Sequence, residues 1–559
     1  LRLARVTKYH DGEVGIQTDL AGIYRALGDG STYLPLTAEI LRNHPPPETL
    51  SALLRERADY FLGKGELQRA DRDAQAAIAA ALQSPDARMM PLARYALARV
   101  RLAQGRFRET LQLLDIAGAE HLDHYPSQVL RARTLRSMGR SRAAVAMYRS
   151  ALELTEGART AIVGKDRQQR LFFATQVDPY VELTDLLAEM GEPLAALAVA
   201  DESKGRALLD ILTGGRPSSA DSMSDAERAR ERELTSRVAA LRTQAEPANE
   251  AALQQAYTAL DTFRADVETR HPNLRVQREA SAKVTKESLA ALLPDQHTAF
   301  IEYSMTAKRL HAFVVRRRAD GTHVTVRTTS VSRRVLEREA TRLVTTLGAR
   351  GFGYETPART LYDLLLRPLA ADLDGVKTIC IVPDGALWQV PFEALLAPDR
   401  RFVASRTATF YAPSIAVYAR MARASAPRRA TPATFLAFAD PPIPEAHDPA
   451  RMALRSTELA PLPDATREVA QIARLFGAGR ASVHVGSDAL EQRVKETSGE
   501  YDVIHFATHG VLDDRNPMYS HLLLAASPGG AGDDGLLEAW EMMRLDLHAQ
   551  LTVLSACDT

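Results

Sequence analysis

Two apolar segments near the C-terminal end of the chain finish in residues that can do chemistry. "YDVIHFATHG" carries His505, His509 and Gly510, and "LTVLSACDT" carries Cys557. Both segments are rich in β-branched and apolar residues, which favours strands. In a parallel α/β sheet, functional side chains gather at the carboxyl ends of strands. We therefore expect an imidazole and a thiol to face each other if these strands are neighbours.

This pairing is suited to nucleophilic catalysis. A free thiol with a pKa of about 8.5 is mostly protonated at neutral pH, whereas the thiolate is the nucleophile. His509 is the expected base that takes the proton from Cys557 and returns it to a leaving amine. The backbone N–H groups of Gly510 and Cys557 are the expected oxyanion donors, and the missing side chain of Gly510 lets a substrate approach.

Other assignments of these residues are weaker. His505 and His509 are four residues apart, which on a strand is about 13 Å and too far for one metal ion. We expect His505 to be a buried, hydrogen-bonded supporting residue and expect no metal site. Ser555 is an alternative hydrolase nucleophile, but no nucleophile-elbow glycines flank it. Cys380, within the strand-like "TICIVPDG", is expected in the core.

The first two hundred residues carry a helical repeat. A small residue, a glycine and a second small residue recur with spacings of seven and five: Ala58, Gly65, Ala70; Ala98, Gly105, Thr110; Ala132, Gly139, Ala144; Thr184, Gly191, Ala196. Ala21 and Gly28 suggest a weaker first copy. Each set predicts a helical hairpin whose glycine turns the chain and whose small residues allow close packing. The step from Ala98 to Ala132 equals the 34-residue tetratricopeptide period, so we expect a stacked, all-α solenoid.

Three parts follow from these patterns. Residues 1–215 form the solenoid, which ends at a Gly-, Pro- and Ser-rich boundary. Residues 216–280 are expected to form a helical hairpin linker. Residues 281–559 alternate short β-rich runs with helical stretches, which favours an α/β domain with a mainly parallel sheet. The chain is therefore predicted to be multidomain.

Composition narrows the class further. Lys plus Arg and Asp plus Glu both number 70, so overall charge gives no support for nucleic-acid binding. Two cysteines exclude a disulfide framework and fit a reducing, cytoplasmic compartment. No run approaches the roughly 18 apolar residues that span a bilayer. We expect no cofactor.

The C-terminal half resembles the CHAT domains, caspase-like peptidases often fused to tetratricopeptide repeats. The resemblance covers roughly residues 280–559 and rests on "HFATHG", "LSACDT", "VPDGALWQVPFEALL", "YAPSIAV" and "LPDATREVAQIARLFG". In caspases the histidine precedes the cysteine by about 50 residues; here the gap between His509 and Cys557 is 48. The resemblance implies a caspase-like fold with His509 as base and Cys557 as nucleophile.

We therefore expect a cysteine endopeptidase that cleaves a protein substrate, with the repeats binding that substrate or a protein activator. The alternative is a non-catalytic scaffold with an inert caspase-like domain. The chain stops two residues after Cys557, so we expect the domain to be truncated and this fragment to be weakly active or inactive.

Overall fold

The structure is a computed structural model. It describes residues 10–119, 125–161, 178–214, 284–424, 433–443, 459–477, 479–512, 520–527, 534–543 and 545–555, with isolated helical residues between 227 and 263. The predicted linker hairpin at 216–280 lies almost entirely outside the described residues, and the predicted nucleophile Cys557 lies wholly outside them.

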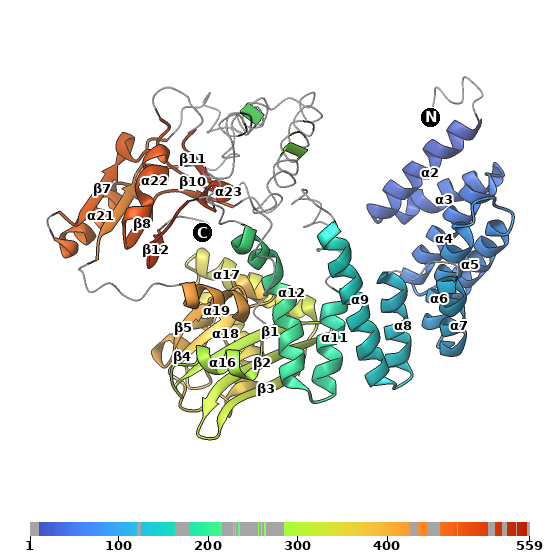
Figure 1. Ribbon diagram of the computed structural model, residues 1–559, viewed down its shortest axis with the longest axis horizontal. Helices are drawn as coiled ribbons and strands as arrows, with labels where there is room; N and C mark the ends of the chain where they lie inside the picture. Colours follow the sequence, from blue (N-terminus) through green and yellow to red (C-terminus); the bar gives the residue numbers. More distant parts are fainter. Residues whose placement is uncertain are drawn as a thin grey trace.

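The N-terminal part consists of paired helices that stack one on the next (Figure 1). The described helices of this part are α2 (His10–Ala26), α3 (Gly30–Arg42), α4 (Pro47–Gly63), α5 (Leu67–Ala81), α6 (Met89–Ala103), α7 (Phe107–Ala119), α8 (Tyr125–Ser137), α9 (Ser141–Ala161), α11 (Asp178–Glu189) and α12 (Pro193–Gly214). This arrangement confirms the predicted helical repeats.

The repeated glycines and small residues have the predicted roles. Gly65, Gly105, Gly139 and Gly191 each sit between two helices with φ between 73° and 76°, the left-handed conformation that glycine adopts without strain. After Gly105, for example, the N–H of Arg106 donates to the carbonyl of Arg101 at 2.9 Å, which closes the helix end as a Schellman motif. All eight small residues of the four sets are fully buried.

A mixed five-stranded sheet follows the repeats. Its order is β3-β2-β1-β4-β5, where β1 (Thr298–Met305), β2 (Arg309–Arg318) and β3 (Gly321–Ser330) run antiparallel and β4 (Thr378–Val382) and β5 (Ala408–Tyr411) lie parallel to β1. The associated helices are α16 (Lys286–Leu292), α17 (Arg333–Gly348), α18 (Glu355–Leu365) and α19 (Ile415–Ala424), with short 3-10 turns η3 (Phe352–Tyr354), η4 (Arg367–Leu369), η5 (Gly385–Gln389), η6 (Phe392–Ala394) and η7 (Val403–Ser405).

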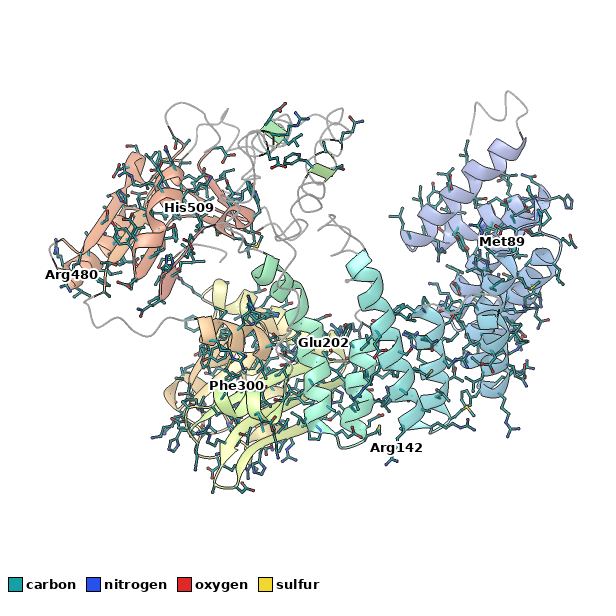
Figure 2. All side chains as sticks on the ribbon, viewed as in Figure 1. Met89, Arg142, Glu202, Phe300, Arg480 and His509 are labelled. Atoms are coloured by element: carbon teal, nitrogen blue, oxygen red, sulfur yellow. The ribbon has the colours of Figure 1, made fainter. Side chains whose placement is uncertain are left out.

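The last helical hairpin shares its core with this sheet. Leu183 and Leu187 of α11 belong to the same apolar cluster as Phe300 and Phe313 of the sheet and the buried Cys380. Figure 2 shows Phe300 inside this part of the molecule. Cys380 is therefore a core residue, as predicted, and burial raises the pKa of its thiol.

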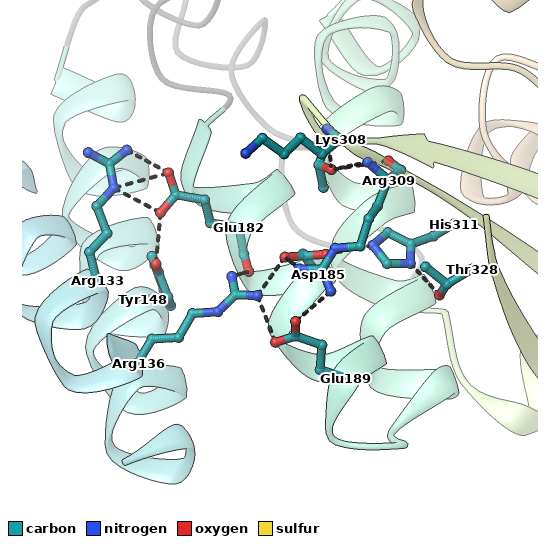
Figure 3. A network of polar contacts seen from close by, with 11 residues as sticks. Arg133, Arg136, Tyr148, Glu182, Asp185, Glu189, Lys308, Arg309, His311 and Thr328 are labelled. Atoms are coloured by element: carbon teal, nitrogen blue, oxygen red, sulfur yellow. Dashed lines mark hydrogen bonds and ion pairs between the residues drawn. The ribbon is translucent and has the colours of Figure 1, made fainter. Parts of the chain in front are cut away.

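A polar network ties the same hairpin to the sheet (Figure 3). Asp185 of α11 accepts hydrogen bonds from Arg136 of α8 and Arg309 of β2, both at 2.5 Å. It also contacts the ring of His311 at 2.8 Å, and the other ring nitrogen of His311 lies 2.9 Å from the hydroxyl of Thr328. The carboxylate of Asp185 thus joins two repeats and two strands at one point.

The C-terminal part holds two further sheets. Four strands, β6 (Phe435–Ala439), β7 (Ala481–Val485), β8 (Val503–Ala507) and β12 (Leu551–Leu554), form a wholly parallel sheet in the order β12-β8-β6-β7. Three short strands, β9 (Gly510–Val511), β10 (His521–Leu523) and β11 (Leu536–Glu538), form an antiparallel sheet. The helices are α21 (Pro463–Phe476), α22 (Glu491–Thr497) and α23 (Ala539–Met542), with 3-10 turns η8 (Gly486–Asp488) and η9 (Ser498–Glu500).

Alternation along β8 explains why this strand is covered on both faces. Ala507 packs with Val469 of α21, whereas Ile504 and Phe506 point to the other face and pack with Val494 of α22. The parallel arrangement agrees with the predicted fold class, although the sheet of β1 to β5 is mixed rather than mainly parallel. The predicted limits at residues 215 and 280 remain predictions.

Among the described residues, no helix is long and apolar enough to cross a bilayer.

Candidate active site

The two strands that carry the sequence motifs are direct neighbours. β12 pairs with β8 in parallel, with Leu551 opposite Val503 and Leu554 opposite Phe506. The ladder continues one residue beyond β12, because the N–H of Ser555 donates to the carbonyl of Phe506 at 2.8 Å. The condition that the two strands are neighbours is therefore met. The assignment of Cys557 stays a prediction.

His509 lies where the chain passes from β8 to β9, and it is 7% exposed. Figure 2 labels it in the C-terminal part of the molecule. Its carbonyl accepts a hydrogen bond from the N–H of Leu523 at 2.8 Å, and the hydroxyl of the preceding Thr508 donates to the carbonyl of Leu523. The backbone around His509 is thus held by β10.

The imidazole of His509 has a defined partner. Its Nε2 lies 2.8 Å from the carbonyl oxygen of Ala460. A carbonyl oxygen only accepts, so Nε2 carries the proton in the neutral ring and Nδ1 keeps its lone pair. Nδ1 is therefore the atom that can take a proton from a nucleophile.

Gly510 is buried at the start of β9, opposite Leu522. The bond from the Leu523 N–H to the His509 carbonyl makes that neighbouring pair a hydrogen-bonded one. Pairs alternate in an antiparallel ladder, so Gly510 and Leu522 form a non-hydrogen-bonded pair. The N–H of Gly510 consequently points away from β10.

His505 is buried in β8 and faces helix α21. Its Nε2 lies 3.1 Å from Oε1 of Glu468, a close approach without the alignment of a good hydrogen bond. Burial lowers the pKa of His505, and the nearby Glu468 carboxylate opposes this effect. His505 is thus buried, and its supporting role stays a prediction. Within the described ranges, no group of three His, Cys, Asp or Glu residues is placed to hold a metal ion.

Ser555 has a carboxylate rather than an imidazole as its partner. Its hydroxyl donates to Oε1 of Glu468 at 3.3 Å. A carboxylate that already lies against His505 is a poor arrangement for activating a serine, since a serine nucleophile needs a base in direct hydrogen-bond contact. The serine alternative therefore gains no support from these contacts.

A cluster of charged side chains connects α22 and α23 to the start of β11. Lys495 of α22 donates to Glu491 at 2.6 Å and to Glu541 of α23 at 2.7 Å, and the second oxygen of Glu491 accepts from the N–H of Gly535 at 2.8 Å. Burial, with the neighbouring Glu541 carboxylate, raises the pKa of Glu491 to about 8. The cluster fastens β11, and through it β10 and β9, to the parallel sheet.

Two contributors to this site were missed from sequence. The carbonyl of Ala460 is a backbone group and has no sequence signal of its own. Glu468 lies in the quoted segment "LPDATREVAQIARLFG", but only its packing beside β8 brings it to His505 and Ser555.

The described structure is that of a helical-repeat protein whose C-terminal part is an α/β domain with a histidine at the carboxyl edge of a parallel sheet. Comparison with known families identifies that domain, because residues 355–559 match the family model of the CHAT domain. This chain therefore carries a CHAT domain, which has a caspase-like fold. His509 and Cys557 both fall within the matched residues.

Among solved structures, the chain is similar to a TPR repeats protein from Bacteroides fragilis at 11% sequence identity, over 40% of this chain and 92% of that chain, with a TM-score of 0.18. No curated protein matches the chain.

Proposed function

We propose that this chain is a caspase-like cysteine endopeptidase whose dyad is His509 and Cys557. The supporting observation is the parallel pairing of β12 with β8, whose ladder reaches Ser555. Leu554 lies opposite Phe506. Cys557 follows Ser555 by two residues, and His509 follows Ala507, the last residue of β8, by two residues.

The proposed reaction uses only groups of this chain. Nδ1 of His509 accepts the proton of the Cys557 thiol, and the thiolate attacks the peptide carbonyl carbon. The imidazolium then donates its proton to the leaving amine as the C–N bond breaks, which leaves a thioester on Cys557. Water attacks the thioester with His509 again as base, and the free thiol and the new carboxyl group are released.

The backbone stabilises the charge that develops on the carbonyl oxygen. We assign the N–H groups of Gly510 and Cys557 to this role because the Gly510 N–H points away from β10. Preformed donors of this kind contribute about 3 to 4 kcal/mol each in hydrolases where one has been removed. The proposed chemistry needs neither a metal nor a cofactor.

The helical repeats are proposed to bind a protein, either the substrate or an activator. Stacked helical hairpins present an extended surface because each hairpin packs only against its neighbours. A reducing, cytoplasmic location suits a thiol nucleophile.

The decisive experiment is labelling with an electrophilic peptide probe. We expect Cys557 to react well above the rate of free cysteine at pH 7, and Cys557→Ala to abolish both labelling and peptide cleavage. Ser555→Ala is the matched control and should retain both. A purely scaffolding protein has no activated thiol, so a labelling rate equal to that of free cysteine would favour the scaffold over the peptidase. Loss of activity in Ser555→Ala alone would favour a serine nucleophile.

A further inference from the structure

The segment from Leu459 to Pro463 lies against the candidate site and is stiff by composition. Its sequence is "LAPLP". Proline disfavours helical backbone at the residue before it and pushes that residue toward extended conformations, which applies here to Ala460 before Pro461. The direction of the Ala460 carbonyl is therefore limited before any tertiary contact is made.

Two contacts fix this segment on either side of Ala460. The side chain of Leu459 packs against Leu523 and Leu536, the small core of the antiparallel sheet. On the other side, the N–H of Leu462 donates to Oδ1 of Asp440 at 2.7 Å. The carbonyl of Ala460 lies between these two anchors and accepts from Nε2 of His509.

Asp440 is itself held in an unusual conformation. It follows β6 directly, its N–H donates to the carbonyl of Ala507 in β8 at 3.2 Å, and its φ is 46°. Left-handed backbone costs most side chains about 1 to 2 kcal/mol, and Asp and Asn tolerate it best. With this backbone conformation, the Asp440 carboxylate lies where it accepts a hydrogen bond from the Leu462 N–H.

We infer that Asp440 and Leu459 are positioning residues, which hold the Ala460 carbonyl against His509 and so keep the imidazole proton on Nε2 and the lone pair on Nδ1. This inference rests on the proposed function, because the lone pair on Nδ1 is what accepts the thiol proton of Cys557. Asp440 and Leu459 themselves touch neither substrate nor nucleophile in this scheme.

The test compares four variants of the whole chain. Asp440→Ala removes the acceptor, and Asp440→Asn keeps an acceptor oxygen and tolerates the same backbone. Leu459→Ala loosens the other anchor. Asp464→Ala is the control, because Asp464 is an exposed carboxylate at the start of α21, two residues beyond Leu462.

The first readout is the ¹⁵N chemical shift of the His509 ring in histidine-labelled protein, assigned with His509→Asn. The second readout is the pH profile of Cys557 labelling by the peptide probe. In Asp440→Ala and Leu459→Ala we expect mixed tautomers of His509 and labelling about tenfold slower or more, because a displaced catalytic group is costly. Asp440→Asn and Asp464→Ala should match the wild type in both readouts.

An unchanged His509 tautomer in both Asp440→Ala and Leu459→Ala would overturn the inference. An equal loss of Cys557 labelling rate in Asp440→Asn and Asp440→Ala would also overturn it. If Asp440→Ala fails to fold, Leu459→Ala alone decides, since it leaves the backbone of Asp440 untouched. The tautomer does not depend on Cys557. A wild-type thiol no more reactive than free cysteine would therefore refute the proposed function, while the ring shifts would still decide the positioning role.

Discussion

Replacing Asp185 with alanine should weaken the attachment of the last helical hairpin to the mixed sheet (Figure 3). The Asp185 side chain is 7% exposed and is the shared partner of Arg136, Arg309 and His311. Burial opposes its ionisation, but hydrogen bonds from His311 and Arg136 outweigh that effect and lower the pKa of Asp185.

The size of the expected stability loss follows from what each partner of Asp185 loses in the variant. Breaking a buried ion pair costs about 3 to 5 kcal/mol where the remaining charge is left without a partner. The two arginines are 23% and 32% exposed and keep Glu189 as a partner, but His311 is buried and loses its carboxylate partner. We therefore expect Asp185→Ala to lower the local free energy of unfolding by about 3 kcal/mol, at the lower end of that range.

Glu189→Ala is the matched control. Glu189 contacts the same two arginines, but its side chain is 41% exposed. Exposed ion pairs contribute about 0 to 1 kcal/mol and are screened by salt. The loss in Glu189→Ala should therefore stay below about 1 kcal/mol and shrink in 0.5 M NaCl at a Debye length of roughly 4 Å.

Hydrogen exchange of the α11 amides under increasing urea measures the local free energy without assuming two-state unfolding of the whole chain. The folded-state pKa of Asp185 is lowered, so its contribution exists above the unfolded pKa of about 3.9 and is lost as pH falls. The gap between wild type and Asp185→Ala should therefore narrow below about pH 4. Equal losses of local free energy of unfolding in Asp185→Ala and Glu189→Ala at neutral pH would refute the reasoning.

Gly105→Ala should destabilise the α6–α7 hairpin by about 1 to 2 kcal/mol in urea unfolding, because φ is 74° and only backbone strain changes, with no atom near the added Cβ. Gly22 lies within helix α2 and also has no atom near an added Cβ, so Gly22→Ala should stabilise α2 by about 0.5 to 1 kcal/mol. A change in stability of the same sign for Gly105→Ala and Gly22→Ala would contradict this account. The pKa of Glu491 is raised to about 8, so its neutral form is favoured in the folded state and stability should fall as pH rises from about 4.5 to 8. Glu491→Gln should make the fall in melting temperature over that range shallower, and an unchanged slope would exclude Glu491 as its source.

The repeats could be predicted from sequence because their determinants are local. A glycine is needed wherever a helix ends in a left-handed residue, and small residues are needed where two helices touch, as at Ala98 and Thr110. The longer strands were predictable for the same reason, since β8 is a dense run of strand-forming residues. The strands β10 and β11 have three residues each, which is too little pattern to predict a strand.

The sequence by itself determined that His509 and Cys557 follow strand-forming segments, since residue type and spacing are properties of the chain. Only the tertiary structure decided that β12 lies beside β8 and that the Ala460 carbonyl, 49 residues away in sequence, meets the ring of His509. Strand order and the direction of a backbone carbonyl depend on contacts between distant segments. Such contacts form only when the whole core packs, so no local pattern records them.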